Sequence, residues 1–291
     1  MNSVRTASGV SPAEQLVSRV AVEIKDYDVI HIGASTPLVL AASLLARATH
    51  APHLTLFPIS MTGVVADGVY PITLTMWEAM AMANGLQYRL IELFNHVEGD
   101  VGFDIEPIAP AQIDKFGNVN NSVIGNYLRP KVRFPGPAGI DNLPLCPRTP
   151  LILYSAHHTK RTFVDRVDFI TGAGFLNGGD DRLKRGIPGN GGPRLVVTNL
   201  AVMDFEEDSK RMRLVSLNPG VTLPDVQENT GFDLVIPKQI PVTPAPSQTQ
   251  LQILREVIDP LDICGLDFVP AAGRRARITE LLAREMEMFA D

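Results

Sequence analysis

The first third of the chain alternates between a buried strand, a helix and a second buried strand, and this alternation constrains the fold most strongly. Residues 28–33 are expected to form a buried strand that ends at Gly33, a helix is expected from Thr36 and Pro37 to about Ala48, and residues 53–57 are expected to form the next strand. Two consecutive strands joined by a helix lie parallel in one sheet, with the helix against a face of it. The sequence therefore predicts an α/β fold, with a mainly parallel sheet flanked by helices.

The residues around Ser11 predict where an earlier helix begins. Ser11 is a good N-cap, Pro12 suits the first helical position, and Glu14 follows the cap by three residues. This spacing is typical of a capping box, in which the serine hydroxyl and the glutamate carboxylate each accept a backbone N–H. We expect a helix that starts at Pro12.

A glycine- and arginine-containing break after Pro270 separates the body of the chain from a C-terminal segment. Beyond it, the apolar residues fall on one side of a helix from Arg274 to Phe289; they are Ile278, Leu281, Leu282, Met286 and Phe289. We therefore expect an α/β domain over residues 11–262. Residues 263–291 form a tail whose amphipathic helix docks on this chain or on a partner.

Composition narrows the class of protein. The 291 residues are 45% apolar and 20% charged, with a formal net charge of −6, so the overall field does not favour nucleic acid. No apolar run approaches the roughly 20 residues that cross a bilayer, and the polar N-terminus lacks the features of a signal peptide. Cys146 and Cys264 stand alone, which predicts buried thiols and no metal site. These features predict a cytoplasmic protein that binds neither membranes nor nucleic acid.

Polar residues gather in the segment 111–122. Gln112 and Asp114 alternate on an extended stretch, Gly117 and Asn118 suit a tight turn, and Asn120 follows. Taken alone, the segment indicates a hairpin held by side-chain-to-backbone bonds. The same amide groups could equally line a binding cleft, and the residues by themselves leave both interpretations open.

A second segment, 133–141, contains two glycines whose backbone N–H groups could face an anion. Chemistry on a thioester needs such donors, because negative charge develops on the carbonyl oxygen. Gly136 and Gly139 bracket this loop. A plain proline-glycine surface loop is the simpler interpretation of the segment on its own.

These segments, in this order, resemble the β subunits of family I coenzyme A transferases, those of the glutaconate CoA-transferases among them. The resemblance covers roughly residues 15–262; the matching pieces are 28–33, 111–120, 129–134, 160–170, 194–198 and 228–234. The element Gln112-x-Asp114-x-x-Gly117-Asn118, followed downstream by Lys160-Arg161-x-Phe163, is the most specific part of the match.

The resemblance implies an αβ pair with two copies of each subunit, an active site formed between α and β chains, and an acyl-CoA substrate. Coenzyme A would enter as part of the substrate, and no covalently bound cofactor is implied. In the transferases a β-subunit glutamate attacks the thioester. The cleft would be lined on this chain by Gln112, Asn118, Asn120, Gly136 and Gly139.

The chain departs from the family at that glutamate. The expected position, just after the second strand, is occupied by Ile59 with Ser60 beside it, and no carboxylate lies between Asp28 and Asp67. Members that lack the glutamate resemble ring-opening hydrolases of steroid catabolism. A second glutamate-free group resembles decarboxylases of methylglutaconyl-CoA, which carry a cysteine there.

Three functions follow as hypotheses. The first is a β subunit of an acyl-CoA hydrolase or lyase, whose α partner supplies the reacting group. The second is a genuine CoA-transferase subunit that moves CoA between carboxylic acids; this would hold if the family's alignment is shifted around Ile59, or if Asp67 or a partner residue substitutes for the glutamate. The third is a non-catalytic structural or regulatory partner of an active α subunit. His157 and His158 follow a predicted strand, and they could either serve in acid–base chemistry or only bond loop carbonyls.

Overall fold

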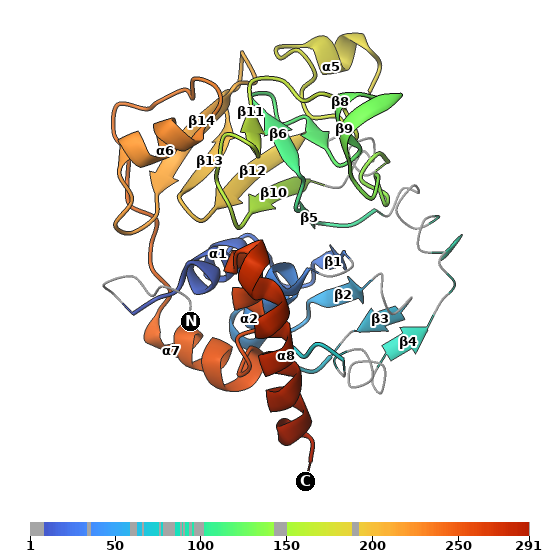
Figure 1. The fold of residues 1–291 in the computed structure, drawn as a ribbon, viewed down its shortest axis with the longest axis vertical. Helices are drawn as coiled ribbons and strands as arrows, with labels where there is room; N and C mark the ends of the chain where they lie inside the picture. The colour runs from blue at the N-terminus through green and yellow to red at the C-terminus, as the bar shows by residue number, and fades with distance from the viewer. Residues whose placement is uncertain are drawn as a thin grey trace. The chain divides into compact units, whose positions relative to one another are not determined.

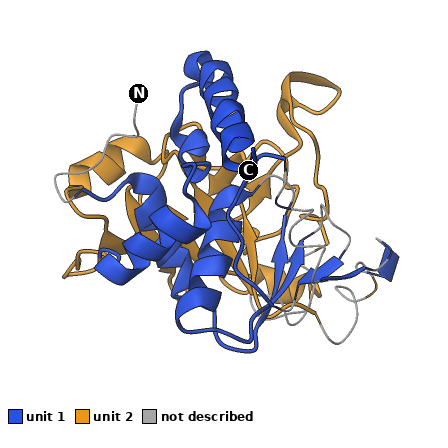
Figure 2. Cartoon of the chain, turned by 90° about the horizontal axis from the view of Figure 1, so that it is seen from below, with its two compact units in different colours: residues 1–93, 245–291 blue, residues 94–244 orange. Residues whose placement is uncertain are grey.

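The computed structural model describes residues 9–33, 36–58, 63–65, 67–75, 77, 85–87, 89, 91–92, 95, 102–142, 150–187 and 192–290. The chain divides into two compact units, coloured separately in Figure 2. Unit 1 combines residues 1–93 with 245–291, and unit 2 comprises residues 94–244. This grouping crosses the boundary expected at residue 262, because the C-terminal residues pack with the N-terminal ones.

Unit 1 is built on a four-stranded sheet with the order β1-β2-β3-β4 (Figure 1). β1 and β2 are parallel, with Ile32 opposite Pro58, whereas β3 and β4 are antiparallel additions. The strands are β1 Val29–Ile32, β2 Thr55–Pro58, β3 Gly63–Val65 and β4 Gly85–Gln87. The predicted strand, helix and strand are thereby confirmed, with α2 (Pro37–Thr49) as the connecting helix.

The first helix, α1 (Pro12–Ala21), starts where the sequence predicts. The hydroxyl of Ser11 accepts the N–H of Glu14 at 3.1 Å, and the Glu14 carboxylate accepts the N–H of Ser11 at 2.6 Å. The other carboxylate oxygen of Glu14 accepts Nε of Arg255 at 2.6 Å, which joins the start of α1 to the C-terminal part of unit 1. One side chain thus caps a helix and fastens two distant segments.

The C-terminal part of unit 1 is helical. Its elements are α7 Gln248–Ile253, the π-helix η3 Leu254–Ile258, the 3₁₀-helix η4 Cys264–Phe268 and α8 Ala271–Met288. The predicted tail helix is confirmed as α8, although only Leu281 and Glu285 of it are buried. Ile278, Leu282 and Met286 remain partly exposed, so the apolar side docks in part.

Unit 2 contains a five-stranded sheet with the order β14-β13-β12-β10-β5. β10 lies between two parallel neighbours, β12 and β5, and the β13 and β14 edge is antiparallel. A smaller β11-β6-β7 sheet and the β8-β9 hairpin complete the unit with two short helices. The bounds are β5 Glu106–Ile108, β6 Gln112–Asp114, β7 Val119–Asn120, β8 Val123–Asn126, β9 Arg129–Arg133, β10 Leu151–Ser155, β11 Phe163–Val164, α5 Asp181–Lys184, β12 Pro193–Thr198, β13 Ala201–Phe205, β14 Met212–Leu217 and α6 Leu223–Asn229.

The α/β class is confirmed, and the two larger sheets are mixed: parallel strands form one end of each sheet, and antiparallel strands form the other end. The most deeply buried large side chains come from both units, for example Leu16 and Leu56 of unit 1 and Phe103 and Phe163 of unit 2. Among the described residues, the helices are too short or too polar to span a bilayer.

Candidate functional site

A cavity of about 450 Å³ lies at the carboxyl ends of β1 and β2 in unit 1. Ile32 and Gly33 border it from the end of β1, and Pro58 borders it from the end of β2. In open α/β sheets ligands bind in the crevice beyond the carboxyl ends of parallel strands. This cavity is therefore the strongest candidate site in unit 1.

The remaining cavity wall comes from three segments. The start of α2 contributes Thr36, Pro37 and Leu40; a second segment contributes residues 72–74 and Trp77; and the C-terminal part contributes Ile263, Leu266, Asp267, Arg274 and Ile278. Only Asp267 and Arg274 among these lining residues carry a charge. The wall is otherwise largely apolar, which suits a ligand with an apolar body and few polar atoms.

The start of α2 adds an electrostatic feature to the cavity. No side chain caps this helix, and its first turn carries no acidic residue. The hydroxyl of Thr36 donates instead to the carbonyl oxygen of Gly33 at 2.6 Å. The first N–H groups of a helix favour negative charge, so this end of the cavity favours an acceptor or anionic group.

Arg47 of α2 holds the backbone on both sides of residues 59–62. Its guanidinium donates to the carbonyl oxygens of Leu54 at 2.6 Å, Val65 at 2.8 Å and Gly68 at 2.9 Å. Burial lowers the pKa of Arg47, but an arginine retains its charge in proteins. The arginine thus connects the backbone on either side of residues 59–62, the segment where the resemblance places the transferase glutamate.

Ile59 and Ser60 lie outside the described residues. Asp67, the next carboxylate along the chain, is exposed, and its Oδ1 accepts the N–H of Gly68 at 2.7 Å. It does not border the cavity described above. Asp267 is the acidic residue that does, a position that the sequence alone did not single out.

Glu285 of α8 fixes one wall of the cavity. The residue is only 2% exposed, and its carboxylate accepts the backbone N–H groups of Leu74 at 2.5 Å and Thr75 at 2.9 Å, together with the Thr75 hydroxyl. Leu74 itself borders the cavity. Glu285 was not predicted from the sequence, in which its position four residues after the apolar Leu281 is the one available signal.

In unit 2, the predicted hairpin at Gly117 is confirmed. β6 and β7 pair antiparallel, with Gln112 opposite Asn120, and Gly117 has a φ of +69°. A Cβ at Gly117 would stand 2.6 Å from Pro193 and 2.7 Å from Phe205, so glycine is required there on two grounds. The polar residues of the segment therefore come together, as the sequence indicates.

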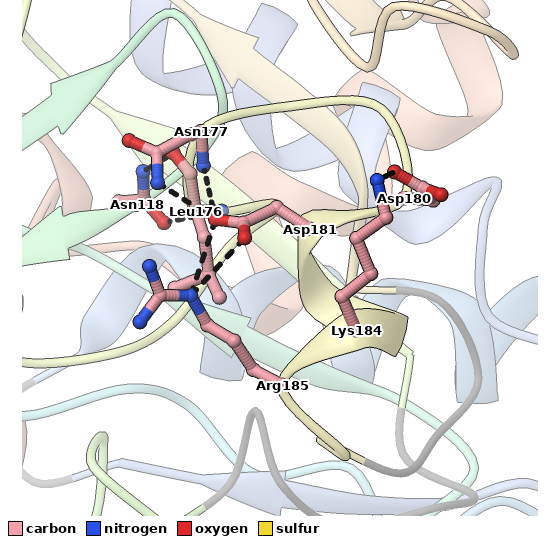
Figure 3. A network of polar contacts seen from close by, with 7 residues as sticks. All are labelled: Asn118, Leu176, Asn177, Asp180, Asp181, Lys184 and Arg185. Carbon is pink, nitrogen blue, oxygen red and sulfur yellow. Dashed lines mark hydrogen bonds and ion pairs between the residues drawn. The ribbon is translucent and has the colours of Figure 1, made fainter.

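The side-chain amides of Asn118 and Asn120 in this hairpin form hydrogen bonds with other groups of the same chain. Asn118 donates to both oxygens of Asp114 and to the carbonyl of Leu176, and it accepts the N–H groups of Gly174 and Leu176. Figure 3 shows Asn118 beside Leu176, with Asn177 bonded to Asp181 nearby. An asparagine with both its oxygen and its nitrogen satisfied acts as a brace between two segments.

Asn120 is used in the same way. Its nitrogen donates to Oε1 of Gln112 and to the Val123 carbonyl, each at 2.7 Å, and its oxygen accepts the N–H groups of Ser122 and Val123. Burial raises the pKa of Asp114, the partner of Asn118, against the bonds that stabilise its charged form. Asn118 and Asp114 border a separate cavity of about 240 Å³ in unit 2.

Gly136 and Gly139 lie in the loop after β9. Their φ angles are +111° and +93°, so both need the conformational freedom of glycine. The N–H of Gly136 donates to the carbonyl of Asn121 at 3.0 Å, which places the loop beside the hairpin but engages that donor. The structure thus groups the five predicted cleft residues in unit 2. Their contact with a substrate stays a prediction.

His158 is buried in unit 2. It stacks on Phe163 at 3.9 Å, and its two ring nitrogens lie 3.0 Å from the hydroxyls of Thr198 and Thr230. Burial lowers the pKa of His158 from 6.5 to about 3, so the ring stays neutral near pH 7. This corrects the acid–base interpretation for His158, whereas His157 is exposed.

The described residues hold no cluster of three or more His, Cys, Asp or Glu side chains that could bind a metal ion. Cys264 is buried in unit 1, with Sγ 3.5 Å from the carbonyl oxygen of Pro37, and burial raises the pKa of its thiol. Cys146 lies outside the described residues. Among the described residues, the unit 1 cavity offers a ligand its apolar wall, the start of α2 and two charged side chains.

The fold and the cavity define the class as an α/β protein with a cavity at the carboxyl ends of a parallel strand pair. A model of the coenzyme A transferase family matches residues 13–229. The chain therefore belongs to the coenzyme A transferase family.

Individual relatives have different activities. The chain is 35% identical over 252 residues to the B-type subunit of 3-oxoadipate CoA-transferase from Pseudomonas knackmussii, covering 85% of this chain and 93% of that protein. It is 30% identical over 252 residues to the IpdB subunit of a cholesterol ring-cleaving hydrolase from Mycobacterium tuberculosis, covering 81% and 90%. The crystal structure of glutaconate CoA-transferase from Acidaminococcus fermentans matches with a TM-score of 0.76 and 29% identity, over 89% of this chain and 98% of that one. Because relatives with either activity match this chain, family membership alone does not distinguish CoA transfer from hydrolysis.

Proposed function

We propose that this chain is the β subunit of an αβ enzyme that cleaves an acyl-CoA by hydrolase or lyase chemistry, without a covalent glutamate of its own. The observation that carries the proposal is Ile59, which directly follows Pro58 at the end of β2, where Pro58 borders the cavity. An aliphatic side chain cannot attack a thioester or carry CoA, so the reacting group must come from elsewhere.

The relatives support an α-type partner. Those described above include one subunit of a CoA-transferase and one of a ring-cleaving hydrolase. By analogy, this chain would pair with an α-type subunit that supplies the acid–base group or nucleophile. This chain would contribute the apolar cavity and the uncapped start of α2, where negative charge on an acyl oxygen is favoured.

A second candidate, CoA transfer, is favoured by one observation. Asp267 is the acidic residue on the cavity wall, and a carboxylate there could replace the missing glutamate as nucleophile. Asp67 is a weaker substitute, because it is exposed and outside the described wall of the cavity.

Covalent trapping separates the two candidates. The complex would be purified through a tag on this chain, incubated with acyl-CoA and treated with hydroxylamine or borohydride. The masses of the peptides of this chain would then be measured by mass spectrometry. We expect no modified carboxylate, and we expect Ile59→Glu, but not Ile59→Gln, to become labelled at residue 59. Label on Asp267 or Asp67 of the unaltered chain would overturn the proposal in favour of CoA transfer.

The same complex tests a purely structural role. If the α subunit alone turns over acyl-CoA as fast as the reconstituted pair, this chain adds no catalytic element. We expect turnover only when both subunits are present.

A further inference from the structure

We infer that α8 is the specificity-determining wall of the cavity and that Ile278 limits the size of the acyl group that it admits. The inference rests on the proposed function in one respect, the identification of the ligand as the acyl part of a CoA thioester. The residues that form the wall follow from the structure alone.

The cavity has the dimensions and lining of a small-molecule pocket. Its volume of about 450 Å³ falls within the range of roughly 300–1,000 Å³ that such pockets occupy. Apolar side chains approach it from the sheet, from α2 and from α8, for example Ile32, Leu40 and Ile278. An aliphatic acyl chain has the complementary chemistry, because it loses no hydrogen bond on entering such a space.

Donors for one acyl oxygen are also present. The uncapped start of α2 borders the cavity, and so does Trp77. Trp77 is 4% exposed, and within the described part of the chain its indole N–H has no hydrogen-bond acceptor. A buried donor without an acceptor is unfavourable, so a ligand oxygen that reached the Trp77 N–H would supply a partner that the described residues lack.

α8 is held firmly enough to act as a fixed wall. Glu285 bonds to Leu74 and Thr75 on the opposite segment. Nearer its start, Arg277 pairs with Asp262 at 2.8 Å, and Arg284 donates to the carbonyl oxygens of Leu261 and Pro260. Ile278 lies between these anchors, which hold this part of the helix in place, and a larger side chain there reduces the space for the ligand.

The chain offers a matched control on the same helix. Ile278 is 37% exposed and borders the cavity, whereas Leu282 is 36% exposed and does not. Ile278→Phe and Leu282→Phe therefore add a similar volume at similarly exposed positions, and only the first adds it at the cavity.

The chain also carries its own reporter, because Trp77 is its single tryptophan. The full chain would be titrated with octanoyl-CoA, butyryl-CoA and free CoA while tryptophan emission is recorded. We expect both acyl-CoAs, but not free CoA, to change the emission. We expect Ile278→Phe to raise Kd for octanoyl-CoA about tenfold and for butyryl-CoA less than about threefold, with Leu282→Phe close to the unaltered chain.

Three outcomes would overturn the inference: equal effects of the two phenylalanine variants, equal weakening of both acyl-CoAs, or an equal response to free CoA. Ile278→Ala provides a second test, in which the cavity is enlarged instead of filled. The ratio of the Kd for butyryl-CoA to the Kd for octanoyl-CoA should be larger in this variant than in the unaltered chain. Far-UV circular dichroism would show that each variant is folded.

Turnover by the αβ complex separates failure of the inference from failure of the proposed function. If the complex cleaves acyl-CoA while the two phenylalanine variants behave alike, only the role of α8 is wrong. If no acyl-CoA is cleaved and none changes the emission of Trp77, the proposed function itself fails.

Discussion

Replacing Glu285 with alanine is expected to loosen the wall that α8 builds against residues 74 and 75. The carboxylate accepts three hydrogen bonds there, two of them from backbone N–H groups. A hydrogen bond to a charged group contributes roughly 1.5–3 kcal/mol, and the contributions do not add in full. Thr75 is exposed, so its donors can turn to water. We therefore expect a loss of about 2–3 kcal/mol in the free energy of unfolding of unit 1.

Urea denaturation and amide hydrogen exchange would measure this effect. The exchange of the Leu74 and Thr75 amides should accelerate in Glu285→Ala and to a smaller extent in Glu285→Gln, which retains one acceptor oxygen. Glu287→Ala is the matched control, because Glu287 is an exposed glutamate of the same helix and should change the free energy by less than about 0.5 kcal/mol. If Glu285→Ala were no more destabilising than the control, or if the two amides exchanged at unchanged rates, the structural role given to Glu285 would be wrong.

Two further predictions concern unit 2. His158 stays neutral in the folded chain, whereas in the unfolded chain it becomes protonated below pH 6.5. The neutral ring therefore contributes fully to the free energy of unfolding above pH 6.5. This contribution is lost toward pH 3, at up to about 1.4 kcal/mol per pH unit. The unfolding free energy of His158→Gln should therefore fall less steeply between pH 6.5 and 5 than that of His157→Gln, as urea titrations at each pH would show. Asn118→Ala should lower the free energy of unfolding by about 2–3 kcal/mol, because it leaves the Gly174 and Leu176 N–H groups without their acceptor. Asn177→Ala, at an exposed site, should lower it by less than about 1 kcal/mol. Equal urea midpoints for the two variants would refute this.

Local features of the structure could be predicted well from the sequence. The capping box at Ser11 sets the start of α1, and the alternation of apolar runs sets β1, α2 and β2, because the signals for these elements lie within a few residues of one another. The turn at Gly117 follows from the same kind of local chemistry.

Long-range partners could not be predicted in this way. Glu285 meets Leu74 across 211 positions of sequence, and no local pattern specifies such a pair. The residue types at Asn118 and Asn120 suit either a braced hairpin or a binding cleft, and the structure was needed to show that both side chains bond to groups of the same chain. For the same reason Asp267 entered the site only through the structure, while Ile59 was already evident from the sequence.

Unit 1 is formed by two segments that are far apart in the sequence, and this affects when it can fold during translation. Its sheet comes from the first 93 residues, but the helices that complete it come from residue 245 onward, with all of unit 2 between them (Figure 2). A ribosome therefore releases the sheet long before it releases α7 and α8, and unit 2 can finish folding in the interval. Until the residues from 263 onward emerge, the cavity lacks lining residues such as Ile263, Asp267 and Ile278, so the nascent chain cannot form the complete cavity before α8 is released.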